Sequence, residues 1–270
     1  MVKQIYADLK SSILFLSRLP MSFSLQAPLP DFSRTPWTFA PAGMIIALPA
    51  ALVLWAAVET GLAAPLAAIL AVATMMLITG ALHEDGLADT VDGFWGGYSR
   101  ERKLEIMRDS TIGTYGVLGL IITVSLRITA LWQLIEHMGA LHSALVVIAI
   151  AGLSRAAMLQ PWSVLPSARP SKSDNDTTKK KDESGLSARY GVPSQKIMAL
   201  GMIAALPAVA ILVWATGWLP AIIGLVLLQF AIFVLLRLSR HHIGGHSGDT
   251  LGATQQLSEL GLLLGLVWTM

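Results

Sequence analysis

The feature that most constrains this chain is a series of apolar stretches, each about as long as a lipid bilayer is thick. A helix needs about 20 apolar residues to cross a hydrocarbon core of about 30 Å. Stretches of that kind lie near residues 38–58, 62–82, 113–135, 141–161, 196–215 and 219–238, with a seventh, more polar one at 252–270. They predict an all-α protein, a polytopic membrane bundle of six to seven transmembrane helices.

Composition agrees with this reading. The chain is 54% hydrophobic and only 13% charged, whereas an ordinary soluble domain is about 25% charged. The net charge of +2 is small, so we expect no nucleic-acid partner. The sequence contains no cysteine, which excludes disulfides and thiolate metal sites. We expect residues 1–270 to form a single integral membrane domain.

The placement of basic residues predicts the orientation of the bundle. Of the 19 Lys and Arg residues, all but Arg127 and Arg155 lie in the N-terminal segment or in the connections 83–112, 162–196 and 237–251. Basic loops stay on the cytoplasmic side. We therefore expect a multi-pass membrane protein whose basic connections and active site face the cytoplasm.

Two segments outside the spans have patterns of their own. Ile5, Leu9 and Ile13 fall near helical spacing between charged residues, which predicts an interfacial amphipathic helix over 1–20. The connection 162–195 includes a long polar run without apolar residues, which is typical of a flexible cytoplasmic loop.

The stretch 81–97, "ALHEDGLADTVDGFWGG", carries the strongest sign of chemistry. Asp85, Asp89 and Asp92 are spaced i, i+4 and i+7, so they share one face of a helix. Like charges at this spacing repel. A divalent cation removes the repulsion, and oxygen ligands suit Mg²⁺ or Mn²⁺. We predict that these three aspartates bind Mg²⁺, with Mn²⁺ as the alternative, and that Gly86 leaves room for a ligand or a second helix.

Charged residues beside this stretch suggest a phosphorylated or diphosphate substrate. Cations shortly after the aspartates would neutralise phosphate groups, while His83 would serve as a hydrogen-bonding anchor. The substrate-binding residues that we expect here are His83, Arg100, Arg108 and Asp109.

A second polar stretch, residues 239–259, is predicted to lie on the same side of the membrane. It holds three histidines, a glycine-rich turn and Asp249. We predict that the two stretches converge into one active site. We expect Asp249 to be an additional metal or substrate contact, and the histidines to contact phosphate or to act as a base. Arg240 is a further candidate for substrate binding.

Two arginines within predicted spans are functional candidates, because charge inside a membrane is costly. Arg155 lies within about two turns of the cytoplasmic end. We expect its side chain to extend toward that end, where it would bind substrate. Arg127 lies deeper and is expected to pair with a buried acceptor.

Several ordered motifs together resemble the cobalamin synthase family, adenosylcobinamide-GDP ribazoletransferase. They are "LFLSRLP", "HEDGLADTVDG", "RERKLEIMRDSTIGTYG", the pair Ala168–Arg169 and "GGHSGDTLGA". The resemblance implies a Mg²⁺-dependent inner-membrane enzyme that joins adenosylcobinamide-GDP to α-ribazole or α-ribazole 5′-phosphate and releases GMP. The chain departs from the family pattern after Arg169, where extra residues leave the segment 169–191 without an assigned role.

On this resemblance, Asp89 is assigned to catalysis as well as to metal binding. Asp249 and His246 are both candidates for the catalytic base, and the sequence does not separate them. Membrane lipid and a second copy of the chain, as a homo-oligomer, complete the partners that we consider. One alternative is a CDP-alcohol phosphotransferase, whose motif matches in part, since its Ala-Arg is Ala88–Asp89 here. Another is an ion transporter, although the acidic residues cluster at a membrane face and transporters bind near the midplane.

Overall fold

The structure of the chain is a computed structural model that describes residues 2–20, 33–169 and 191–270. Those residues form helices, with one isolated β-bridge between Ser167 and His246. The helices are α1 (Val2–Leu16), a short 3-10 helix η1 (Thr35–Thr38), α2 (Phe39–Glu59), α3 (Ala64–Thr79), α4 (Leu82–Gly96), α5 (Arg100–Ile106), α6 (Thr114–Ala157), α7 (Leu159–Val164), α9 (Gln195–Ala204), α10 (Leu206–Thr216), α11 (Trp218–Ile243) and α12 (Gly248–Val267).

The predicted helical membrane bundle is confirmed as a class. Four described segments are long and apolar enough to cross a membrane: Thr35–Glu59, Thr114–Val164, Gln195–Thr216 and Trp218–Ile243. A fifth results if the bent pair α3 and α4 counts as one span. The number of six to seven spans remains a prediction. In α11, large apolar side chains stay exposed at nearly every turn, as expected for a lipid-facing surface: Ile222, Val226, Phe230 and Phe233.

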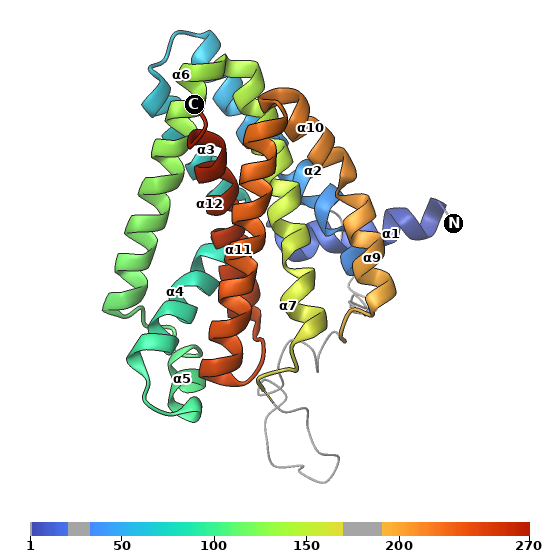
Figure 1. Cartoon of the computed structure of the whole chain (residues 1–270), viewed down its shortest axis with the longest axis vertical. Coiled ribbons are helices and arrows are strands. Elements are labelled where there is room, and N and C mark those ends of the chain that lie inside the picture. Colours follow the sequence, from blue (N-terminus) through green and yellow to red (C-terminus); the bar gives the residue numbers. More distant parts are fainter. Residues whose placement is uncertain (1, 21–32, 170–190) are drawn as a thin grey trace.

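Helix α6 contains both spans predicted at 113–135 and 141–161. Gly139 interrupts it with φ 77° and ψ −178°, which no helical residue adopts. Figure 1 shows the chain rising through the first part of α6 and returning through the second. Helix α5 and the ends of α7 and α11 therefore lie at one end of the bundle, and the C-terminus lies at the other end.

The span predicted at 62–82 is shorter than expected, and the acidic stretch is not its continuation. Helix α3 ends at Gly80, whose φ is 64°, and Ala81 follows with φ 55°, the one positive φ at a non-glycine residue in the described part of the chain. The chain then turns by 88° into α4. The aspartates thus lie on a separate helix, which is set at a steep angle to α3.

Helix α12, the most polar of the predicted spans, lies inside the bundle against α4, α6 and α11. Its polar residues are buried: Gln255, Gln256, Ser258 and Glu259. The Gln255 amide donates to Ser154 Oγ of α6 at 3.0 Å and to Glu259 Oε2 at 2.7 Å. Side chains that would be costly against lipid therefore find partners in the interior.

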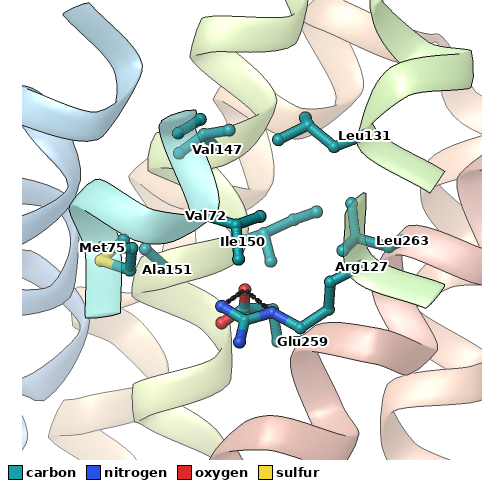
Figure 2. Close-up of a pocket in the computed structure, with 10 residues that line it drawn as sticks. Val72, Met75, Arg127, Leu131, Val147, Ile150, Ala151, Glu259 and Leu263 are labelled. Carbon is teal, nitrogen blue, oxygen red and sulfur yellow. Dashed lines mark hydrogen bonds and ion pairs between the residues drawn. The ribbon is translucent and has the colours of Figure 1, made fainter. Parts of the chain in front are cut away.

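Arg127 lies at the centre of this polar interior and confirms the predicted buried acceptor. Its guanidinium contacts Glu84 of α4 at 2.8 Å and Glu259 of α12 at 2.7 Å, and it donates to Gln256 Oε1 at 3.0 Å. Figure 2 shows Arg127 and Glu259 meeting below an apolar cavity. The network joins α4, α6 and α12, so it fixes the first turn of α4 to the bundle.

The cavity in Figure 2 has a volume of about 30 Å³ and is lined mostly by aliphatic side chains. This volume has room for a water molecule. Arg155 lies close by, is 1% exposed and donates to Ala151 O of its own helix at 3.0 Å. The expected extension of Arg155 to the membrane face is therefore wrong, because its side chain turns inward, where the carboxylates of Glu84 and Glu259 balance its charge and that of Arg127.

The predicted interfacial helix 1–20 is helical over Val2–Leu16. Its C-terminal half belongs to the core, where Ile13 and Leu16 are buried, while Ile5 stays exposed. Asp8 is also buried and accepts a hydrogen bond from Trp37 Nε1 at 3.1 Å. Most of the predicted loop 162–195 lies outside the described residues, and its first residues belong to α7.

We predict that Arg127→Leu lowers the free energy of unfolding by about 3–5 kcal/mol, because it leaves two buried carboxylates without a cation. Chemical unfolding in detergent micelles measures this. The control is Arg102→Leu, which removes an exposed arginine paired with Glu105 and should change stability by less than about 1 kcal/mol. Equal stability of the two variants would contradict a structural role for the network.

Candidate active site

The two polar stretches meet where α4 crosses the start of α12, as predicted. The crossing occurs at Gly86 and Gly252. A Cβ atom on Gly86 would lie 2.9 Å from Asp249 O and 3.3 Å from the Gly252 Cα. Only residues without side chains permit so close an approach. The crossing brings Asp85 and Asp89 next to Asp249.

The first turn of α12 holds Asp249 in place. Ser247 and Thr250 form a capping box around the helix N-terminus. Asp249 Oδ2 accepts from Ser247 Oγ at 3.2 Å and pairs with the Arg169 guanidinium at 3.4 Å. The carboxylate therefore has a defined position.

The carboxylates repel one another strongly enough to change their protonation. Asp89 lies on α4, outside the four spans, and is half-buried. Burial, followed by the charges of Asp249, Asp85 and Asp92, raises the pKa of Asp89 to about 7. Burial also raises the pKa of Asp249, against the opposing effect of Arg169. A cation bound among these groups would relieve the repulsion.

Two cavities meet at Asp85, which is exposed. The smaller one, about 170 Å³, reaches Asp249 and has apolar walls formed by Phe15, Leu82, Met158 and Leu251. The larger one, about 470 Å³, lies at the bend between α3 and α4 and is lined by Ser17, Arg18, Thr79 and Gly80 among others. A ligand in either cavity can therefore reach Asp85.

Asp92 has a structural role that the sequence did not predict. It is buried, and its two oxygens accept hydrogen bonds from Gly113 N at 2.7 Å and Gly116 N at 2.8 Å. These amides belong to the unpaired N-terminus of α6, where a carboxylate is favourable. Asp92 thus caps α6, and Gly113 and Gly116 are small because the carboxylate occupies the space beside them.

The donor set suits Mg²⁺ only if the substrate completes it. Within the described ranges, no three His, Asp or Glu side chains lie close enough to hold one ion. Mg²⁺ commonly takes one or two carboxylates, with water and substrate phosphates as the other ligands. Asp85 and Asp89 fit that pattern, with Asp249 beside them. Metal binding by the three aspartates remains a prediction, and Asp92 could take part only by giving up its hydrogen bonds to the amides of Gly113 and Gly116.

The two candidate histidines are both buried, in different surroundings. His83 lies in the first turn of α4, near Arg127 and Arg155, and lines the smaller cavity. His246 pairs through Nδ1 with Leu165 O at 3.0 Å. Burial lowers the pKa of His246. Its backbone also bonds to that of Pro166 and Ala168, so His246 fixes the segment that carries Arg169.

The candidate substrate-binding residues around the site differ in their exposure and in the contacts that their side chains make. Arg100 donates to Ile243 O at 2.8 Å and to Ala168 O at 2.6 Å, so it ties α5 to the end of α11. Asp109 is exposed, and its hydrogen bonds with Thr111 lower its pKa. Arg108 is exposed and acts electrostatically on Asp249. Arg240 is exposed in the last turn of α11.

Sequence reasoning missed Arg169 and Glu84 as parts of the site. Arg169 is the cation nearest to Asp249, and its only sequence signal was the pair Ala168–Arg169. Glu84 directly precedes Asp85 but points the other way, into the bundle, where it meets Arg127. At about 100° per residue, Glu84 lies about 100° around the helix from Asp85, off the face that the three aspartates share.

Comparisons with known proteins identify the family of the chain. The family described as cobalamin-5-phosphate synthase matches residues 8–267. The chain belongs to this family. Three curated relatives carry the name adenosylcobinamide-GDP ribazoletransferase. The protein of Allorhizobium ampelinum is 41% identical and covers 96% of this chain and 95% of its own length. That of Bradyrhizobium diazoefficiens is 41% identical, covering 97% and 94%. That of Rhizobium etli is 38% identical, covering 98% of each chain.

No solved structure matches the chain. The family nevertheless makes the protein an enzyme of the transferase class that acts in cobalamin synthesis. The family match includes α4, the α4–α12 crossing and both cavities.

We predict that Gly86→Ala lowers the free energy of unfolding by about 1–3 kcal/mol, because its methyl group would be forced against the backbone of α12. The matched control is Gly96→Ala at the end of α4, where the new Cβ would meet only Ile106 Cδ1 at 3.6 Å. That control should be as stable as wild type, since alanine favours helix. Thermal unfolding in detergent compares the two, and equal midpoints would contradict the close crossing.

Proposed function

We propose that this protein joins adenosylcobinamide-GDP to α-ribazole or α-ribazole 5′-phosphate, releasing GMP. The 3′-hydroxyl oxygen of the ribazole attacks the phosphorus atom on the cobinamide side of the diphosphate. The bond from that phosphorus to the bridging oxygen breaks, GMP leaves with the bridging oxygen, and the hydroxyl proton passes to a base. The names of the curated relatives support the substrates.

The observation that carries the proposal is the meeting of Asp85, Asp89 and Asp249 beside two adjoining cavities, of which Asp85 lines both and Asp249 the smaller one. A diphosphate brings several negative charges, so acidic residues alone would repel it. Bound Mg²⁺ would supply positive charge to neutralise the diphosphate and the departing phosphate. Asp85 and Asp89 are the residues that would hold the ion, and Arg108 and Arg169 are nearby cations that suit the remaining phosphate charge.

Asp249 is favoured over His246 as the base. The raised pKa of Asp249 makes its carboxylate a better proton acceptor than an ordinary aspartate. It also lines the smaller cavity, where an acceptor hydroxyl has access to it. His246 is held on the backbone of Leu165, which suits a residue that supports the loop.

The location follows from the same arrangement. Helix α4, which carries Asp85 and Asp89, runs toward the end of the bundle where the basic helix α5 lies (Figure 1). Basic connections favour the cytoplasmic side. We therefore propose an enzyme of the inner membrane with its active site open to the cytoplasm.

Asp89→Asn is expected to leave the protein folded and to reduce GMP release by at least about 100-fold. It removes a carboxylate that would hold the metal, and the amide retains the shape of the side chain. Purified protein is given adenosylcobinamide-GDP, α-ribazole and Mg²⁺, and GMP is measured. The control is Glu105→Gln, which neutralises an exposed carboxylate on α5 and should retain full activity. Wild-type turnover by Asp89→Asn under saturating Mg²⁺ would refute the assignment.

The same assay separates the two alternatives. A CDP-alcohol phosphotransferase would release CMP from CDP-diacylglycerol and leave the GDP-activated corrinoid intact. A transporter would turn over neither substrate in detergent, where there are no compartments.

A further inference from the structure

The larger of the two cavities at Asp85 owes its shape to the bend between α3 and α4. A hollow of about 470 Å³ lies at this bend of 88°, with Gly80 and Ala81 among the residues that line it. Helix α1 ends beside this hollow, and the residues that follow α1 line it. These residues belong to the motif "LFLSRLP", whose contribution to the site has so far been unexplained.

Hydrogen bonds of its own backbone and of the preceding residue hold Arg18 at the hollow. Its backbone N–H donates to Ile78 O at 2.7 Å, which attaches the chain to the last turn of α3. The preceding Ser17 hydroxyl donates to Ile13 O at 2.7 Å. The Arg18 side chain then lies across Gly80, so closely that a Cβ on Gly80 would collide with Arg18 Nε. Glycine is therefore needed at position 80 for two reasons. Its φ of 64° lies in the left-handed region, and the Arg18 side chain occupies the space where a Cβ atom would lie.

The two charged side chains in this cavity are both available to a ligand. Arg18 and Asp85 line the same hollow and are exposed. Among the residues that the structure describes, neither side chain makes a hydrogen bond or an ion pair, whereas Arg34, Arg100, Arg127 and Arg169 all have such partners. A guanidinium and a carboxylate that share a cavity without pairing leave space for a group between them.

We propose that Arg18 binds a phosphate of the substrate and that the hollow at the α3–α4 bend is the diphosphate subsite. A guanidinium binds phosphate oxygens through paired N–H donors. The adjoining smaller cavity, with its apolar walls and Asp249, is then left for the acceptor nucleoside. The two substrates would meet at Asp85, the one charged residue that lines both cavities. This inference rests on the proposed function.

A purely structural use of Arg18 would have other consequences. A cation at the C-terminus of α3 would stabilise the helix through its dipole, and lysine would serve as well as arginine. Phosphate of a lipid headgroup offers the same chemistry as phosphate of the substrate. The experiment must therefore separate a substrate phosphate from a helix cap and from a lipid.

The test compares Arg18→Gln and Arg18→Lys with the control Arg102→Gln in lipid-free detergent. We expect Arg18→Gln to raise the KM for adenosylcobinamide-GDP by about ten- to 100-fold, with the KM for α-ribazole unchanged. Arg18→Lys should recover part of the loss, and Arg102→Gln should behave as wild type. Calorimetry with GDP and Mg²⁺, which requires no turnover, should show GDP binding weakened by a similar factor in Arg18→Gln.

Each other outcome contradicts the proposal. An unchanged KM and unchanged GDP affinity would exclude a phosphate contact. A lower unfolding midpoint, fully restored by lysine, with unchanged KM would assign Arg18 to the end of α3. An effect that appears only when anionic lipid is added would assign it to a headgroup. If the wild-type protein releases no GMP, the proposed function fails, yet the GDP titrations still decide whether Arg18 binds phosphate.

Discussion

The buried ion pairs of Arg127 are the interaction on which the rest of the structure depends. A guanidinium in the interior of a membrane bundle is costly unless it is paired and hydrogen-bonded. Arg127 meets that requirement through Glu84 and Glu259, which come from two different helices. Because Glu84 directly precedes Asp85, the contact that satisfies the arginine also fixes the turn of α4 that carries the site. The orientation of the carboxylates is therefore set from inside the bundle.

The close crossing of α4 and α12 then adds the third carboxylate to the site. Gly86 and Gly252 let α4 and α12 approach until the backbones touch, and this brings Asp249 to the aspartates of α4. Asp92 caps α6 in the same region, so one short helix is tied to two neighbours by carboxylates that face away from the cavities. Two of its four acidic side chains, Asp85 and Asp89, remain for chemistry. This division separates structural from functional charge within fifteen residues.

Much of this arrangement could be predicted from the sequence, and the exceptions have physical causes. The apolar runs predict the helices because length and hydropathy suffice to mark a span, and the need to pair Arg127 predicts a buried acceptor. The turn at Gly80 and Ala81 could not be predicted, because the apolar run continues to the turn without a charged residue or proline. The capping by Asp92 and the inward direction of Arg155 depend on which helix lies opposite, which spacing along one helix does not reveal. Arg18 and Arg169 reach the site from segments far away in the chain.

The central claim is that one face of α4, held by Arg127, presents Asp85 and Asp89 together with Asp249 to a diphosphate. An experimental structure of the protein with GDP and Mg²⁺ in a lipid nanodisc tests it most directly. The account predicts density for the ion between the diphosphate and the carboxylates of Asp85 and Asp89, with Arg127 still joining Glu84 to Glu259. A nucleotide bound away from α4, or Asp85 and Asp249 on opposite sides of the bundle, would contradict it.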